Sequence, residues 1–159
     1  GGGAIVTNDV LLGIKAKHLT TTAKIPHQYE YVHDEIGYNF RMPNLNAALV
    51  CAQLEQLDSF IENKRKLALE YNTFFKSQGI NFRTELPNTK ANYWLMCVEL
   101  SNKNERDSFL TLTNENGVMT RPIWQLIFKS SLYSEFQKDE QTNALYLEDR
   151  IVNIPSSVR

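Results

Sequence analysis

An amide and a guanidinium stand two residues apart in the segment Gly37-Tyr38-Asn39-Phe40-Arg41-Met42-Pro43. In an extended segment, side chains two positions apart point to the same side, so Asn39 and Arg41 are placed to donate together to a phosphate. An equally open interpretation is that Asn39 hydrogen-bonds loop backbone while Arg41 pairs with Asp34 or Glu35. The residue types alone therefore predict either an anion site or a structural network.

Histidines and carboxylates near this segment raise the question of a metal site. The residues are His18, His27 and His33 with Asp34 and Glu35, but their spacing matches no common site, and hydrogen-bonded loop histidines are more frequent. The sequence also lacks the P-loop, Gly-x-Gly-x-x-Gly, Gly-x-Ser-x-Gly, His-Glu-x-x-His and paired Cys-x-x-Cys motifs. We expect no bound metal and none of the chemistries that those motifs serve.

Composition is that of an ordinary globular protein and excludes a disordered or low-complexity chain. Of 159 residues, 42% are apolar and 22% charged, and the formal net charge of -1 gives no basic field to attract nucleic acid. No apolar run approaches the ~20 residues that span a bilayer. Cys51 and Cys97 lie in apolar runs and are predicted to be reduced thiols in the core. We expect a cytoplasmic protein without membrane or nucleic-acid partners.

Several elements must position these side chains. Residues 4–7 have the composition of a short strand, and Asp9 is suited to cap a helix that runs to about His18. Residues 19–41 lose all periodicity and predict a loop of a length that is usually functional when it lies inside a compact domain.

A helix follows Pro43, and from Leu45 to Leu57 it is apolar almost all round. Such a helix is buried by neighbours, either in its own chain or across a subunit boundary. The next stretch is amphipathic, and Gly79 is a plausible C-terminal stop.

The remaining residues predict an α+β arrangement, with a small, mostly antiparallel sheet and helices on one face. The expected elements are strands at 93–100, 118–121 and 151–154 and helices at 105–116 and 141–149, with an aromatic loop at 122–124.

The stretch GYNFRMPNLNAALVCAQLEQLD resembles the G-Y-N-x-R-M-x-x-x-x-A-A-L-x-x-x-Q-L-x-x-L-D motif of the DegT-type nucleotide-sugar aminotransferases. These are pyridoxal phosphate (PLP) enzymes of the fold type I aspartate aminotransferase superfamily. The segments GGGAIVTND, HLTTTAKIPHQYEYVHDEIGYNFRMP, TRPIW and IVNIPSS are similar to the same family in the same order, so the resemblance covers essentially the whole chain. The loop is closest to the LegC-like branch, which aminates the 4-keto position of UDP-linked 6-deoxy-N-acetylhexosamines.

The resemblance implies that the chain corresponds to the C-terminal portion of such an enzyme. The family holds PLP on a lysine a few residues upstream of the glycine run, whereas Lys15, Lys17 and Lys24 follow the glycines here. No catalytic residue is therefore assigned within the chain, and we expect the isolated chain to be inactive. The implied divisions are 1–42, a remnant of the large domain with the interface loop; 43–78, the connecting helices with one long helix; and 79–159, the small α+β domain.

Roles for individual residues also follow from the resemblance. Asn39 would reach the PLP phosphate of the partner subunit, and Arg41 would lie near the same composite site, where a diphosphate or the cofactor phosphate offers an anion. The substrate side would be lined by loop side chains together with two residues of the small domain, and these are His33, Tyr29, Tyr31, Tyr38, Arg121 and Trp124. The sequence departs from the family after Trp124, where a frequent histidine is replaced around 126–128.

The implied function is transfer of an amino group, from a donor such as glutamate, to a keto-sugar nucleotide for surface polysaccharide or glycan synthesis. The implied assembly is a homodimer through the Leu45–Leu57 helix. Two alternatives remain open: a PLP-dependent sugar dehydratase of the same family, and a module without catalysis that dimerises or binds a nucleotide-sugar.

Overall fold

The computed structural model describes all 159 residues and divides into two compact units, Gly1–Leu57 and Asp58–Arg159. Together the units contain helices and small antiparallel sheets, which confirms the predicted α/β class with an α+β C-terminal part. No helix combines the length and the apolar character that a bilayer crossing requires. The finer division at 42 and 78 stays a prediction.

The first unit begins with helix α1, Val10–Thr20. Asp9 caps it as predicted, because its Oδ1 accepts from the backbone N–H groups of Leu11 at 2.9 Å and Leu12 at 3.1 Å. The predicted strand at residues 4–7 is wrong, since this segment is irregular and Ile5 is 67% exposed. Residues of high β-propensity form a strand only where another segment supplies hydrogen bonds, and no segment pairs with residues 4–7.

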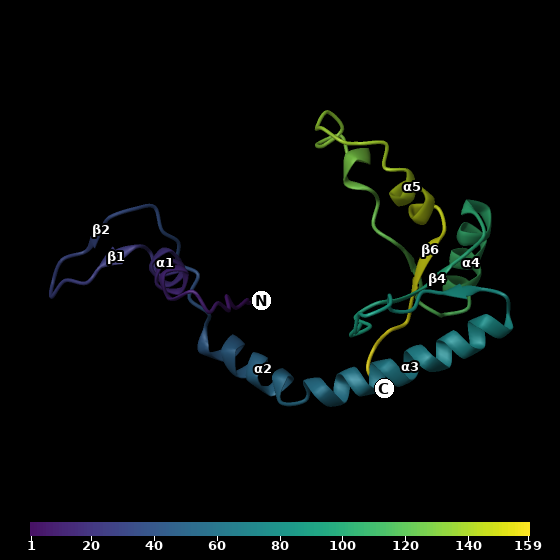
Figure 1. Ribbon diagram of the computed structural model, residues 1–159, viewed down its shortest axis with the longest axis horizontal. Coiled ribbons are helices and arrows are strands. Elements are labelled where there is room, and N and C mark those ends of the chain that lie inside the picture. The colour runs from purple at the N-terminus through teal and green to yellow at the C-terminus, as the bar shows by residue number, and fades with distance from the viewer. The chain divides into compact units, whose positions relative to one another are not determined.

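The loop predicted at 19–41 instead carries a short hairpin that continues from the end of α1 (Figure 1). Strand β1, Lys24–Ile25, pairs antiparallel with β2, Val32–His33. Gly37 packs against the backbone of Thr22 and Ala23, just before β1. A Cβ at this position would lie 2.5 Å from the Ala23 nitrogen, which excludes any larger residue. Packing rather than periodicity therefore orders the segment.

Two helices follow, α2 from Asn44 to Leu54 and α3 from Leu57 to Ser77. α2 buries none of its residues, and Cys51, predicted in the core, is exposed. The apolar runs indicated burial, but no other element of the first unit buries a residue of this helix. α3 is the predicted long helix, and Gly79 follows it with a φ of +71°, as expected for a C-terminal stop.

The second unit is built on an antiparallel sheet of four strands in the order β3-β4-β6-β5. The strands are β3, Asn81–Phe82; β4, Met96–Glu99; β5, Arg121–Pro122; and β6, Ile151–Ile154. β4 and β6 run side by side next to helix α4, Lys103–Glu115, and the remaining helices are η1, Ile127–Lys129, and α5, Thr142–Glu148 (Figure 1). The predicted strands at 93–100 and 118–121 are therefore shorter or shifted, and β3 was missed.

The core of this unit lies where α3 and α4 pack on the sheet. Alternate residues of β4 are buried, and Cys97 between them is only half-buried, so the prediction of a core thiol there is wrong. The buried cluster consists of Leu67, Ala68, Phe75, Phe82, Met96, Val98, Leu100, Val152 and Ile154, with Phe109 and Leu110 of α4 packed against it. The prediction of helices packed on a small antiparallel sheet is confirmed.

Candidate functional site

Asn39 and Arg41 lie side by side and hydrogen-bond to each other. The Arg41 guanidinium donates through Nη1 to Asn39 Oδ1 at 3.1 Å and through Nη2 to the Thr21 carbonyl at 3.1 Å. An antiparallel bridge between Thr21 and Asn39 keeps the segment extended, so both side chains share one side, as their alternation predicts. Because Oδ1 of Asn39 accepts from Arg41, the Nδ2 group is left to donate.

The alternative pairing of Arg41 with a carboxylate is wrong. Asp34 Oδ1 lies 2.6 Å from His18 Nε2, and both oxygens of Glu35 accept from Lys15 Nζ at 2.5 Å. The hydrogen bond with His18 lowers the pKa of Asp34. With both carboxylates engaged elsewhere, the exposed Arg41 remains available to an external anion.

The histidines do not gather into one cluster. His18, Asp34 and Glu35 have ligand atoms within 4.8 Å of one another, but the Lys15 ammonium already supplies a cation to this group. His27 Nδ1 accepts from the Glu30 N–H at 2.9 Å. The expectation that the chain holds no metal stays a prediction.

The four other residues predicted in this unit are exposed around the hairpin, and Tyr29 is one of them, at 76% exposed. His33 of β2 places Nδ1 2.7 Å from the Thr22 carbonyl. Tyr31 is 81% exposed, with the Lys24 ammonium 4.1 Å from its ring centre, and Tyr38 stacks on Phe40 at 5.2 Å. All four offer accessible polar groups, and their role toward a substrate stays a prediction.

Arg121 of β5, in the second unit, is anchored through a buried polar network. Its Nη1 donates to Asn114 Oδ1 at 3.1 Å and to the Thr120 carbonyl at 3.0 Å. Thr120 is 1% exposed, and its hydroxyl lies 2.6 Å from that of Thr113. The network fixes one edge of the guanidinium and leaves Nε and Nη2 without a partner in the chain.

Trp124 lies in the loop after β5, and Glu148 of α5 holds that loop. Glu148 is 7% exposed; its Oε1 accepts from the Leu126 N–H at 3.0 Å, and its Oε2 pairs with Lys129. Desolvation raises the pKa of Glu148, but the hydrogen bonds from Lys129 and Leu126 outweigh it, so the pKa is lowered. Sequence reasoning missed Glu148, since nothing in its neighbourhood distinguishes it from a surface carboxylate.

Arg121 and Trp124 line one cavity of about 820 Å³, and Trp94 lines it too, with its ring centre 6.4 Å from that of Trp124. The other predicted site residues belong to the first unit, and they are Asn39, Arg41, His33, Tyr29, Tyr31 and Tyr38. Trp94 was predicted as a strand residue and not as a site residue. The side chain of Trp94 is 69% exposed, and this exposure, which marks it as a candidate site residue, is evident only from the fold.

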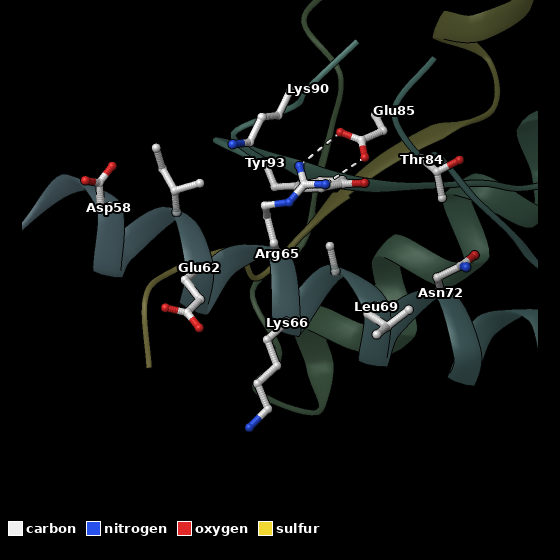
Figure 2. Close-up of a pocket in the computed structure, with 12 residues that line it drawn as sticks. Asp58, Glu62, Arg65, Lys66, Leu69, Asn72, Thr84, Glu85, Lys90 and Tyr93 are labelled. Carbon is white, nitrogen blue, oxygen red and sulfur yellow. Dashed lines mark hydrogen bonds and ion pairs between the residues drawn. The ribbon is translucent and has the colours of Figure 1, made fainter. Parts of the chain in front are cut away.

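A second cavity of about 820 Å³ lies between α3 and the loop of residues 84–93, and it contains none of the predicted site residues. Figure 2 shows Arg65 directed at Glu85 with Tyr93 beside it, whereas Lys66 points away. Arg65 donates to both oxygens of Glu85, at 3.0 and 2.7 Å, which together with the Ala91 N–H lowers the pKa of Glu85 to about 2. The central charge of this cavity is thus already neutralised by its own partner.

Comparison with known proteins gives consistent matches along the chain. Residues 1–159 match the model of the DegT/DnrJ/EryC1/StrS aminotransferase family. GDP-perosamine synthase of Escherichia coli O157:H7 is 33% identical over 156 residues, which are 98% of this chain and 42% of that protein.

Two solved structures share the fold. Helicobacter pylori PseC, an aminotransferase involved in the biosynthesis of pseudoaminic acid, aligns with a TM-score of 0.87 at 21% identity, over 97% of this chain and 43% of that one. The PLP form of Spr1654 from Streptococcus pneumoniae aligns with a TM-score of 0.82 at 16% identity, over 98% of this chain and 41% of that one. The chain thus spans about two fifths of the length of these proteins.

Proposed function

The chain belongs to the DegT/DnrJ/EryC1/StrS aminotransferase family, and we propose that it is part of a PLP-dependent sugar aminotransferase. The whole protein would transfer an amino group from glutamate to the keto carbon of a sugar nucleotide. We propose a UDP-linked 4-keto-6-deoxy-N-acetylhexosamine as the substrate, for surface polysaccharide or glycan synthesis. Both cysteines are free thiols, which fits the reducing cytoplasm as the compartment.

The observation that carries this proposal is the paired Asn39 and Arg41. A cofactor phosphate needs several donors and a positive charge, and the Nδ2 of Asn39 and the N–H groups of Arg41 that point away from Thr21 supply both. The donor set therefore fits the phosphate of PLP. When bound, PLP supplies the electron sink for amino transfer. Asn39 and Arg41 hold and orient its phosphate in this proposal.

His33, Tyr31 and Tyr38 are proposed to contact the sugar nucleotide. The Thr22 carbonyl beside His33 Nδ1 favours the tautomer with the proton on Nδ1, which leaves Nε2 to accept a hydrogen bond from a sugar hydroxyl. The hydroxyl groups of Tyr31 and Tyr38 are available as further hydrogen-bond partners because neither forms a bond within the chain. These residues bind and orient the substrate in the proposal and move no proton.

The proposed assembly is a homodimer in which α2 packs against the partner subunit. Leu45 is 81% exposed, Leu49 63% and Leu54 61%, and exposed apolar faces of this size indicate an interaction surface. Asn39 and Arg41 precede α2 by only a few residues, so a partner subunit that packs on α2 would lie near these two side chains.

The test is an amino-transfer assay on the whole protein with PLP, glutamate and the 4-keto-6-deoxy sugar carried by UDP, GDP or dTDP. We expect an amino sugar to form with the UDP substrate, detected by mass spectrometry, and much less with the others. Turnover of the GDP substrate alone would overturn the choice of UDP. Loss of a sugar hydroxyl without incorporation of nitrogen would instead indicate a dehydratase.

A further inference from the structure

Two side-chain pairs join helix α1 to the segment that follows strand β2. Lys15 Nζ donates to both carboxylate oxygens of Glu35 at 2.5 Å, and His18 Nε2 lies 2.6 Å from Asp34 Oδ1. Lys15 and His18 are three positions apart and therefore share one face of the helix. Asp34 and Glu35 are neighbours in the chain, so the helix holds the segment at two adjacent points. We call these four side chains the α1 clamp.

A ladder of backbone hydrogen bonds continues from the α1 clamp to the segment that carries Asn39. The Tyr38 N–H donates to the Leu19 carbonyl at 2.7 Å. The Phe40 N–H donates to the Thr20 carbonyl at 2.9 Å. The end of α1 thus fixes the backbone on both sides of Asn39, and a change in the distance between the helix and this segment moves the Asn39 amide.

The same end of α1 orients the guanidinium of Arg41. Its Nη2 donates at 3.1 Å to the carbonyl of Thr21, the C-terminal cap of the helix. Thr22 and Ala23 follow with φ angles of +76° and +49°, a conformation that is strained for residues other than glycine. Ala23 is fully buried and its N–H donates to the His18 carbonyl at 2.8 Å, so packing enforces the strained turn. The direction of the carbonyl that receives Arg41 is therefore fixed.

The α1 clamp is too exposed to contribute much to the stability of the fold. Lys15 is 53% exposed and Glu35 33%, and ion pairs at such positions are weakened by water. A small free energy that holds a segment in its binding conformation is nevertheless measurable in a binding constant, where it changes the affinity by a few fold.

We propose that the residues of the α1 clamp are positioning residues that hold Asn39 and Arg41 in the arrangement that accepts a phosphate. None of the four side chains contacts the ligand. They act through the backbone ladder and through the Thr21 carbonyl. The identity of the ligand, the phosphate of PLP, rests on the proposed function.

The test is titration of the apoprotein of the whole protein with PLP, followed by absorbance, together with amide hydrogen exchange of Tyr38 and Phe40 measured without cofactor. Lys15→Met and Glu35→Gln are each expected to weaken PLP binding by about 2- to 5-fold and to speed the exchange of both amides. The double variant should bind no more weakly than either single variant, because both remove the same pair. Lys15→Arg restores a cation and should retain most of the affinity.

Glu35→Gln separates a positioning role from a purely electrostatic one. Removal of a negative charge would strengthen the binding of an anion if only the field of Glu35 mattered, whereas loss of position weakens it. In the Arg41→Met background Glu35→Gln should lose most of its effect, because the clamp acts through that side chain. Lys17→Met is the matched control, since Lys17 is an exposed lysine of the same helix outside the clamp, and it should change neither readout.

Wild-type or stronger PLP binding by the Glu35→Gln variant would overturn the proposal, as would an equal loss in the Arg41→Met background. An effect of Arg41→Met without one of Glu35→Gln would reject only the clamp. PLP binding that is insensitive to Arg41→Met would instead reject the phosphate site of the proposed function. Circular dichroism of each variant verifies that the fold is intact.

Discussion

Replacement of Arg41 by methionine tests the proposed phosphate site most directly. Methionine keeps most of the length of the side chain but removes the charge and every donor. Hydrogen bonds to charged groups contribute about 1.5 to 3 kcal/mol, so we expect the whole protein to bind PLP about 10- to 150-fold more weakly. Arg41→Lys retains the charge without the planar guanidinium, and its PLP affinity is expected to fall between those of the wild type and the Arg41→Met variant.

The contact between the two side chains gives a second measurable quantity. Asn39→Ala alone is expected to cost about 1 kcal/mol, or about fivefold in PLP affinity, because it removes one neutral donor. Since Arg41 donates to Asn39 Oδ1 at 3.1 Å, loss of Arg41 also frees the amide to rotate. The double variant should therefore lose less than the sum of the single losses. Asn39→Asp replaces the donor by a carboxylate near the phosphate and should bind PLP more weakly than Asn39→Ala.

The assay is titration of the apoprotein with PLP, followed by absorbance, with inorganic phosphate as a competitor. Circular dichroism and sedimentation verify that each variant is folded and has the oligomeric state of the wild type. If the Arg41→Met protein is folded and binds PLP with wild-type affinity, Arg41 does not hold the cofactor phosphate. If the Arg41→Met substitution instead lowers only the affinity for the sugar nucleotide, the anion that Arg41 binds is the diphosphate of that substrate.

Three further outcomes are expected. Leu49→Arg on α2 should convert the whole protein to monomers in sedimentation without loss of helix, because a charge cannot be buried in an apolar interface, and an unchanged dimer would refute the role of α2. Met96→Ala should destabilise the protein to urea by about 2 to 5 kcal/mol, whereas Met119→Ala, at a side chain 68% exposed, should change it by less than about 0.5 kcal/mol. Because the pKa of Glu85 is lowered from 4.5 to about 2 by Arg65, its contribution is present above pH 4.5 and is lost as the pH falls towards 2; Glu85→Gln should therefore be less stable than wild type at pH 7 and indistinguishable from it near pH 2.

Local patterns in the sequence were sufficient for features that depend on neighbouring residues. The Asp9 cap and the stop at Gly79 depend on contacts or backbone angles within a few positions. The long motif around Arg41 was sufficient to indicate the family, because it combines many residue types in one order. Periodicity likewise predicted the long helix α3, which is amphipathic and buries its apolar face.

Tertiary structure decided everything that depends on a partner segment. Residues 4–7 have strand composition but no strand to pair with, and Cys51 lies in an apolar helix that the rest of its unit does not bury. Trp94 looked like an interior strand residue, yet its carbonyl accepts from Lys64, 30 positions away along the chain, and its exposed ring lines a cavity beside Trp124. The burial of a side chain and the direction in which an aromatic ring points are set by the sum of long-range contacts. These contacts leave no periodic pattern in the sequence.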